Sequence, residues 1–385
     1  MFSTFAAIVE KHYKIKMKDE IKSGRLMSLD TLRGLDMFFL MGFAVLVTNI
    51  TKFWPDSSVA QSIAAQMDHV QWNGLADHDT IFPVFLFIAG ISFPFSLAKQ
   101  RERGHTEGQI LYKTIKRGIV LVLLGAMYNG FFDLDFANLR IASVLGRIGL
   151  AWMFSALLFM KFKTKVLAVI APVILIGYWL AMWLIPGGPD PFSYENNLVG
   201  VIDRAILPGH LYENGFFDPE GLFSTLPAIV TAMLGMFTGK LIRLPEEKLS
   251  GLKKCRYLVI GGIALLVIGY AWSLVFPLNK KLWTSSFVCV VAGYPMLAFA
   301  LFYYLIDIKQ YRRWTLFFRV IGMNSITIYL TMRIFDYGQI SNFFLHGFTK
   351  MCSGTWADLI NTVGYIIVGW LYLYFLYRKK VFLKV

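Results

Sequence analysis

The chain has 385 residues, of which 56% are hydrophobic and 16% are charged, and its mean hydropathy is +0.56. These values exclude an ordinary soluble domain, in which roughly 25% of residues are charged. A spanning helix needs about 20 mostly apolar residues, so a chain of this length with roughly half of its residues embedded has room for about ten spans. We therefore expect an all-α, polytopic membrane bundle in contact with the lipid bilayer, and not a soluble enzyme with a single anchor.

The net charge of +14 does not indicate a nucleic-acid partner, because the Lys and Arg residues fall in short runs between apolar stretches. Such runs determine the topology of a membrane protein. The cysteines, Cys255, Cys289 and Cys352, are odd in number and have no CxxC spacing. The sequence therefore predicts neither a disulfide framework nor a thiolate metal site.

Apolar segments alternate with polar connections along the whole chain. The predicted spans are approximately 34–50, 80–98, 115–131, 141–160, 165–186, 222–242, 256–277, 283–306, 316–335 and 358–377. With the N-terminus inside, every basic cluster falls on the cytoplasmic side, at 99–117, 161–165, 240–256, 312–313 and 378–380. We therefore predict ten spans with both termini cytoplasmic, a cytoplasmic N-terminal segment at 1–25, and one transmembrane domain at 26–385.

The opposite side receives two connections that are longer than a turn requires, 51–79 and 187–221. Long connections in a compact bundle are commonly functional or disordered. Gly235 and Gly239 form a GxxxG pair in the sixth segment. Such a pair usually packs helices of one chain together, and contact with a second copy in a homodimer is the alternative interpretation.

The densest group of polar residues stands at the outer start of the second segment. His69, Trp72 and Asn73 are followed by His78 and Asp79. A neutral imidazole beside a carboxylate is the usual arrangement of a general base, so His69 with Asp79 is a candidate pair. A solvated interfacial loop with Trp72 as an aromatic anchor is the simpler interpretation. A metal site of His69, His78 and Asp79 is a third, which no further histidine at helical spacing supports.

Further polar side chains lie within the apolar segments themselves. Arg147 falls in the fourth segment, Asn324 in the ninth, and Arg33 with Asp36 at the start of the first. Ionisable and polar groups at membrane depth are costly, and they mark interhelical contacts or functional paths. Together these residues predict a polar path from one face to the other, which a transporter or a transmembrane transferase would need.

Several strings in this order resemble the heparan-α-glucosaminide N-acetyltransferase family and its bacterial relatives, within the wider transmembrane acyltransferase superfamily. The strings are 28–34 (SLDTLRG), 69–90 (HVQWNGLADHDTIFPVFLFIAG), 145–149 (LGRIG), 218–227 (DPEGLFSTLP), 279–286 (NKKLWTSS) and 322–325 (GMNS). The resemblance implies transfer of an acetyl group from cytosolic acetyl-CoA, across the membrane, to an amino sugar on the other side. It also implies a multi-pass protein of the inner (cytoplasmic) membrane and no metal cofactor.

The resemblance assigns roles to residues of this chain. His69, before Gln71, Trp72 and Asn73, matches the family's essential histidine, and Asp79 matches the carboxylate before the Phe-Pro pair. His78 has no counterpart in that motif. We also expect acceptor or thioester contacts for Trp72, Asn73, Arg147, Asn324 and Asp218. From their positions at helix entries, and not from the resemblance, we expect CoA-phosphate contacts for Arg33, Arg117 and Arg319.

Two other functions fit the same residues. One is a sugar transporter related to N-acetylglucosamine uptake, although the two halves of the chain lack the matching pair of broken helices typical of inverted-repeat carriers. The other is O-acetylation of a cell-envelope glycan, in which a histidine base is needed even more because a hydroxyl keeps its proton near pH 7. Transfer through a ternary complex and transfer through an acetyl-histidine both remain open.

Overall fold

The computed structural model describes residues 26–185, 188–352 and 354–383, and the predicted N-terminal segment 1–25 lies outside them. Within the described residues the backbone is helical and contains isolated β-bridges but no β-strand. The all-α prediction is therefore confirmed. The first half contains α2 (Met27–Phe38), η1 (Phe39–Phe43), α3 (Ala44–Thr51), α4 (Ser58–Gln66), α5 (Asp77–Glu102), α6 (Glu107–Tyr128), η2 (Phe131–Asp133), α7 (Val144–Lys161) and α8 (Thr164–Leu184).

The second half continues in the same way. It contains α9 (Leu198–Ile206), α10 (Thr225–Ile242), α11 (Gly251–Trp272), α12 (Ser285–Phe302), η3 (Tyr303–Ile308), α13 (Thr315–Gly322), α14 (Ser325–Ile334), α15 (Tyr337–Met351) and α16 (Thr355–Lys379). In the described part of the chain, eight helical stretches are long and apolar enough to cross a membrane, and α13 with α14 makes a bent ninth. The remaining predicted segment, 115–131, corresponds to α6, whose first half carries Lys113, Lys116 and Arg117. The protein is thus a multi-pass membrane bundle.

Two of the predicted segments, the first and the ninth, are interrupted in the structure. The first begins earlier, at Met27, and is interrupted by η1, where Gly42 has a φ of 126°. The ninth is broken after Gly322, and its two halves are bent by 69°. The side-chain Nδ2 of Asn324 donates to Val320 O at 3.1 Å, so a carbonyl that a continuous helix would pair with the backbone is already used. Hydropathy alone does not detect such competition.

Glycines bring α5 and α10 into backbone contact at the centre of the bundle. A Cβ at Gly235 would lie 2.1 Å from Phe87 O, and one at Gly239 would lie 2.3 Å from Ile91 O. The GxxxG pair therefore packs two helices of the same chain, as the first interpretation predicted. This contact matters for the site, because α5 carries Asp79 at its start and has its position set by α10.

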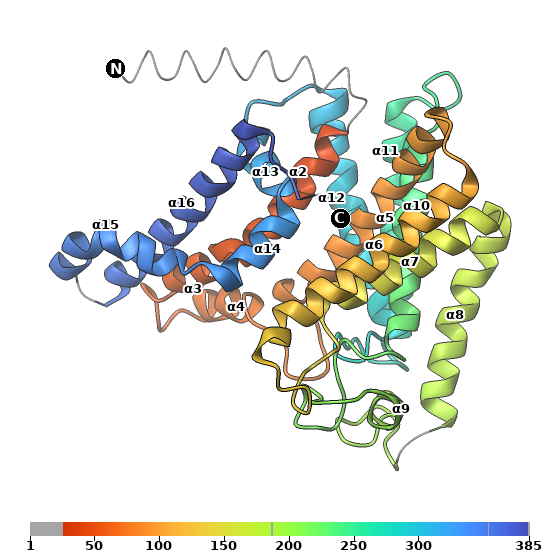
Figure 1. Ribbon diagram of the computed structural model, residues 1–385, viewed down its shortest axis with the longest axis horizontal. Helices are drawn as coiled ribbons and strands as arrows, with labels where there is room; N and C mark the ends of the chain where they lie inside the picture. The colour runs from red at the N-terminus through yellow and green to blue at the C-terminus, as the bar shows by residue number, and fades with distance from the viewer. Residues whose placement is uncertain (1–25, 186–187, 353, 384–385) are drawn as a thin grey trace.

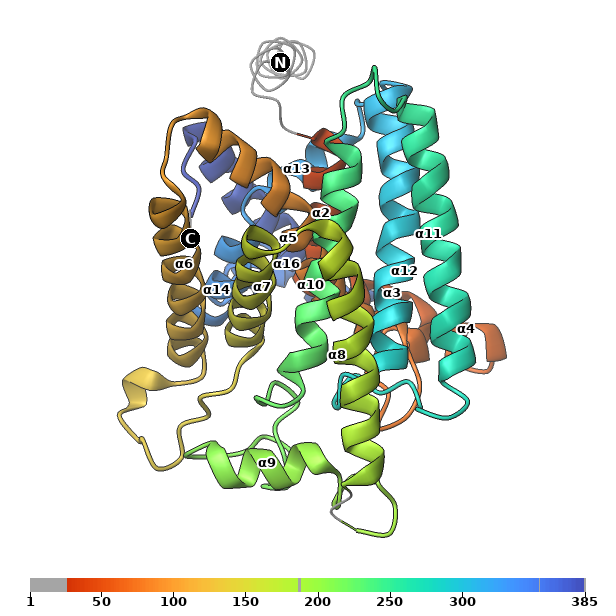
Figure 2. The ribbon, with the colours of Figure 1, turned by 90° about the vertical axis from the view of Figure 1, so that its right-hand side faces the viewer.

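The connections separate into two groups at opposite ends of the bundle. The turns α5–α6 and α10–α11, the start of α2 and the end of α16 lie towards one end in Figure 1 and Figure 2, which we call the basic end. The long connections that contain η2 and α9, and the turn 273–284, lie towards the other, which we call the loop end. The two ends match the two sides that the charge pattern distinguished.

Candidate active site

The chain between α4 and α5 folds back over the start of α5. Asp79, in the first turn of α5, accepts the backbone N–H groups of Val70 (3.2 Å) and Ala76 (3.3 Å) through Oδ2. A carboxylate in the first turn of a helix satisfies otherwise unpaired N–H groups and is favoured by the helix dipole. Asp79 is thus buried and capped into place, and it holds the segment that carries His69.

His69 and Asp79 form the pair that the sequence predicts. His69 Nδ1 lies 2.7 Å from Asp79 Oδ1, and the imidazole is about half exposed while the carboxylate is almost fully covered. A neutral histidine that donates from Nδ1 to a carboxylate has its lone pair on Nε2. The arrangement therefore leaves Nε2 free to accept a proton from a molecule at the loop end.

Lys280 is a third member of this group that the sequence analysis did not single out. Its Nζ lies 3.3 Å from Asp79 Oδ1 and 3.2 Å from His69 Nδ1. Burial lowers the pKa of Lys280 from its ordinary value, and the charge of Asp79 opposes that effect. The only sequence signal was its place in the string 279–286, which motif comparison noted without assigning a role.

His78 packs against the same imidazole. The ring centroids of His69 and His78 are 4.5 Å apart with the rings edge to face, and His78 Nδ1 is buried without a hydrogen-bond partner among the described residues. Across the described chain, no group of three His, Cys, Asp or Glu side chains is arranged to hold a metal ion.

Trp72 and Asn73 fasten the His69 segment to its neighbours. Trp72 Nε1 donates to Phe192 O at 3.1 Å, and its ring meets those of Tyr194 and Phe217 edge on. Asn73 Oδ1 accepts from Asn279 Nδ2 at 3.2 Å. Both residues thus lie at the loop end, close in sequence to His69, and each already has a protein partner.

Asp218 stands in a separate ion-pair group at the loop end. Arg140 donates to both of its carboxylate oxygens at 2.7 Å and also contacts Glu220. Burial opposes ionisation of Arg140, but the contacts with Asp218 and Glu220 raise its pKa above the ordinary value. This group ties the η2 connection to the segment before α10.

Asp203 also holds the segment before α10 in place. Its buried carboxylate accepts the backbone N–H groups of Asp218 and Leu222, each at 3.2 Å. Burial raises the pKa of Asp203 to about 6, although these two hydrogen bonds and the charge of Arg147 favour the ionised form. The carboxylate therefore changes charge close to physiological pH.

Arg147 is buried within α7. Its Nη2 donates to Gly221 O at 3.3 Å and contacts Ser224 Oγ, and its guanidinium lies 5.0 Å from the ring centre of Trp283. Nε and Nη1 have no hydrogen-bond partner among the described residues. Arg147 does not line either cavity described next, so its predicted contact with the thioester remains a prediction.

A cavity of about 680 Å³ opens from the basic end between α2, α5, α6, α7 and the α13–α14 break. Its wall contains Arg33, Arg117 and Asn324, which the sequence analysis named as site residues, and Lys99 and Arg243, which it placed only in basic connections. Arg33 contacts Asp30 and donates to Ser92 Oγ, and Arg117 lies 4.3 Å from the ring centre of Trp152. The buried Arg319 is not part of this wall.

A small apolar cavity of about 30 Å³ continues from the large one towards the loop end. The two share the lining residues Phe85, Ile148, Ser325 and Ile326. The small cavity reaches Ile81, two residues after Asp79, which is a rise of about 3 Å along the helix. The two cavities therefore follow one another along α5 from the basic mouth to the level of Ile81.

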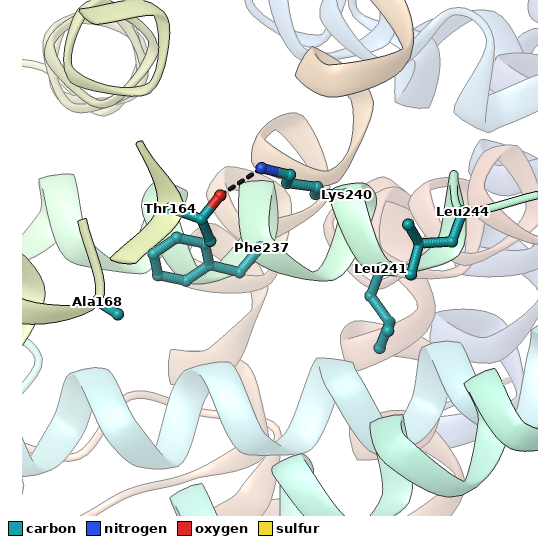
Figure 3. A pocket seen from close by; sticks show the side chains of 6 residues that line it. All are labelled: Thr164, Ala168, Phe237, Lys240, Leu241 and Leu244. Carbon is teal, nitrogen blue, oxygen red and sulfur yellow. Dashed lines mark hydrogen bonds between the residues drawn. The ribbon is translucent and has the colours of Figure 1, made fainter. Parts of the chain in front are cut away.

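Figure 3 shows a further pocket, of about 290 Å³, between α8 and α10. Lys240 contacts Thr164 Oγ1 across it, and Phe237 and Leu241 supply apolar walls. It shares no lining residue with the two cavities along α5. Nothing in its position connects it to His69.

The chain is similar in sequence to curated proteins. No protein-family model matches the chain. Curated relatives include the heparan-alpha-glucosaminide N-acetyltransferases of Homo sapiens, 27% identical over 417 residues, and of Mus musculus, 26% identical over 420 residues. The chain is homologous to these N-acetyltransferases. The motif resemblance is thereby confirmed over 94% of the chain, which spans about 60% of the length of these relatives.

Proposed function

We propose that this protein is a transmembrane acetyltransferase of the inner membrane that moves the acetyl group of acetyl-CoA to the amino group of a glucosamine-type sugar. The named activity of its relatives supports the reaction class. The observation that carries the proposal is the position of the His69–Asp79 pair at one end of α5, whose other end lines a basic cavity. We propose that the basic end is cytoplasmic, in accordance with the positive-inside rule.

The large cavity suits the donor. The phosphates of CoA are bound well by Arg and Lys, and Arg33, Lys99, Arg117 and Arg243 all border this cavity. Arg117 Nε and Asn324 Oδ1 are buried in its wall without a hydrogen-bond partner among the described residues. Buried polar groups are normally paired, so these atoms fit a polar ligand that binds there.

The two cavities that follow one another along α5 suit delivery of the thioester. From Ala89 in the large cavity to Asp79 the helix rises about 15 Å. The narrow part between Phe85 and Ile148 is apolar, which favours an extended, uncharged arm over a hydrated ion. Side chains at this constriction must move for the acetyl group to pass, and in the structure the space there is small.

The chemistry follows from the free Nε2 of His69. The amine nitrogen of the sugar attacks the thioester carbonyl carbon, the carbon–sulfur bond breaks, and CoA leaves as a thiolate. His69 Nε2 takes the proton that the nitrogen loses and returns it to the sulfur, so the products are an amide and a thiol. Asp79 orients the imidazole and stabilises it while it is charged.

The test measures acetyl-CoA binding and thiol release by the detergent-purified protein with glucosamine, with N-acetylglucosamine and with no sugar. We expect saturable acetyl-CoA binding and thiol release that glucosamine stimulates. H69A should abolish the stimulated release and leave binding intact. H210A is the matched control, because His210 is an exposed histidine of the loop end. Its turnover should equal that of the wild type.

Each other outcome contradicts part of the proposal. Full turnover by H69A would exclude His69 as the base. Turnover with a hydroxyl acceptor but not with glucosamine would show that the protein is an O-acetyltransferase and not an N-acetyltransferase. Absence of acetyl-CoA binding in every arm would overturn the enzyme assignment, and sugar flux into proteoliposomes would then test for a carrier.

A further inference from the structure

The charge balance around His69 depends on a residue far from it in the sequence, Lys280, to which the motif comparison assigned no role. Lys280 Nζ lies within 3.3 Å of Asp79 Oδ1 and within 3.2 Å of His69 Nδ1, and its side chain is about one quarter exposed. Since an ammonium group has no lone pair, Lys280 can only donate. Its acceptor is therefore the carboxylate, which His69 Nδ1 also uses.

We infer that Lys280 is a positioning residue that holds Asp79 as a carboxylate and keeps the imidazole of His69 neutral, with its proton on Nδ1 and its lone pair on Nε2. This inference rests on the proposed function, in which Nε2 is the base. With a lysine cation already beside Asp79, a proton on Nε2 would place two positive charges around one carboxylate. Without Lys280, Asp79 would stabilise an imidazolium alone, and a proton on Nε2 would be less unfavourable.

The other groups around the imidazole do not replace this effect. Asp68 Oδ1 accepts the backbone N–H of His69 at 2.7 Å, but it is exposed, and water screens its charge. His78 packs edge on against the ring and is not an ion-pair partner of Asp79. Within the described residues, Lys280 is therefore the cation that directly contacts both members of the pair.

The turn that presents Lys280 is held by other contacts. Thr284 N donates to Asn279 O at 3.1 Å, Leu282 N donates to Asn279 Oδ1 at 2.9 Å, and Gly74 N donates to Leu278 O at 2.8 Å. Trp283 is buried, and its Nε1 donates to Thr231 Oγ1. Removal of the Lys280 charge should thus leave the turn in place.

The experiment compares wild type, K280M, K280R and K281M in two assays over a range of pH. The first is kcat/KM for glucosamine-stimulated thiol release. The second is the rate at which diethyl pyrocarbonate, which reacts with neutral imidazole, modifies His69, followed by mass spectrometry. K281M is the matched control, because Lys281 is the adjacent lysine and pairs with Glu213 at 2.9 Å.

We expect K280M to move the acid limb of both profiles to higher pH by about one unit, the size typical of a lost neighbouring charge. K280R should restore the wild-type limbs, and K281M should not change them. A K280M protein that binds acetyl-CoA normally and keeps both limbs within about 0.2 units would overturn the inference. If the wild type has no turnover, the proposed function fails, while the modification profile still decides whether Lys280 controls the protonation of His69.

Discussion

Asp79 and His69 are joined by a 2.7 Å contact, and the second oxygen of the same carboxylate caps the first turn of α5. One side chain therefore connects the candidate base to the helix that borders the whole line of cavities. The geometry of the base depends on the same contacts that begin the helix, so the function and the stability of Asp79 variants are linked.

D79N should separate the two contributions. An amide keeps an oxygen for the backbone N–H groups of Val70 and Ala76, but it removes the charge that stabilises a protonated His69. We expect the melting temperature to change little and kcat to fall by about 10²- to 10⁴-fold, the usual range for general-base catalysis. Thiol-release kinetics and a thermal melt check this. D77N, at an exposed acid two residues earlier, should leave both values unchanged.

R117A should weaken acetyl-CoA binding. Charge-assisted hydrogen bonds contribute about 1.5 to 3 kcal/mol, so we expect Kd to rise about 10- to 100-fold while kcat at saturating donor changes little. Equilibrium binding with the purified protein measures the loss. K113A, at an exposed lysine one turn earlier on α6, is the control. An unchanged Kd for R117A would remove Arg117 from the donor site.

Asp203 should make stability depend on pH. Its pKa is raised to about 6 in the folded protein, against an unfolded value of 3.8, so the folded state binds the proton more tightly. Its contribution to stability is therefore greatest below about pH 4 and declines as the pH rises through 6. The melting temperature of the wild type minus that of D203N should therefore decrease between about pH 4 and pH 6 and stay constant above pH 6. A constant difference from pH 4 to 7 would contradict the raised pKa.

G235A should destabilise the bundle. The added Cβ would lie 2.1 Å from Phe87 O, so α5 and α10 must separate, and overpacking of this kind costs about 1 to 3 kcal/mol. Thermal unfolding in detergent measures the loss. G177A, on α8, is the control, because no heavy atom lies within 4 Å of the position of its Cβ. Equal melting temperatures for the two variants would mean that α10 packs differently against α5.

The spacing and composition of the sequence were sufficient to predict much of the fold and part of the candidate site. The positions of the helical segments, the two sets of connections and the neighbouring His69 and Asp79 could be predicted, because hydropathy and short motifs are properties of adjacent residues. The breaks at Gly42 and Asn324 could not be predicted from them, since they arise from a glycine in a left-handed conformation and from a side chain that takes a backbone carbonyl.

The sequence by itself determined that the protein is a multi-pass helical bundle with its basic connections set apart from its acidic ones, since the lipid environment imposes a length and a composition on each span. The tertiary structure alone decided which polar groups meet from distant parts of the chain. Lys280 stands 201 positions from Asp79, and Asn279 stands 206 from Asn73, yet both pairs are in contact. Such contacts depend on how helices pack through their glycines and buried rings, and no local pattern encodes that distance.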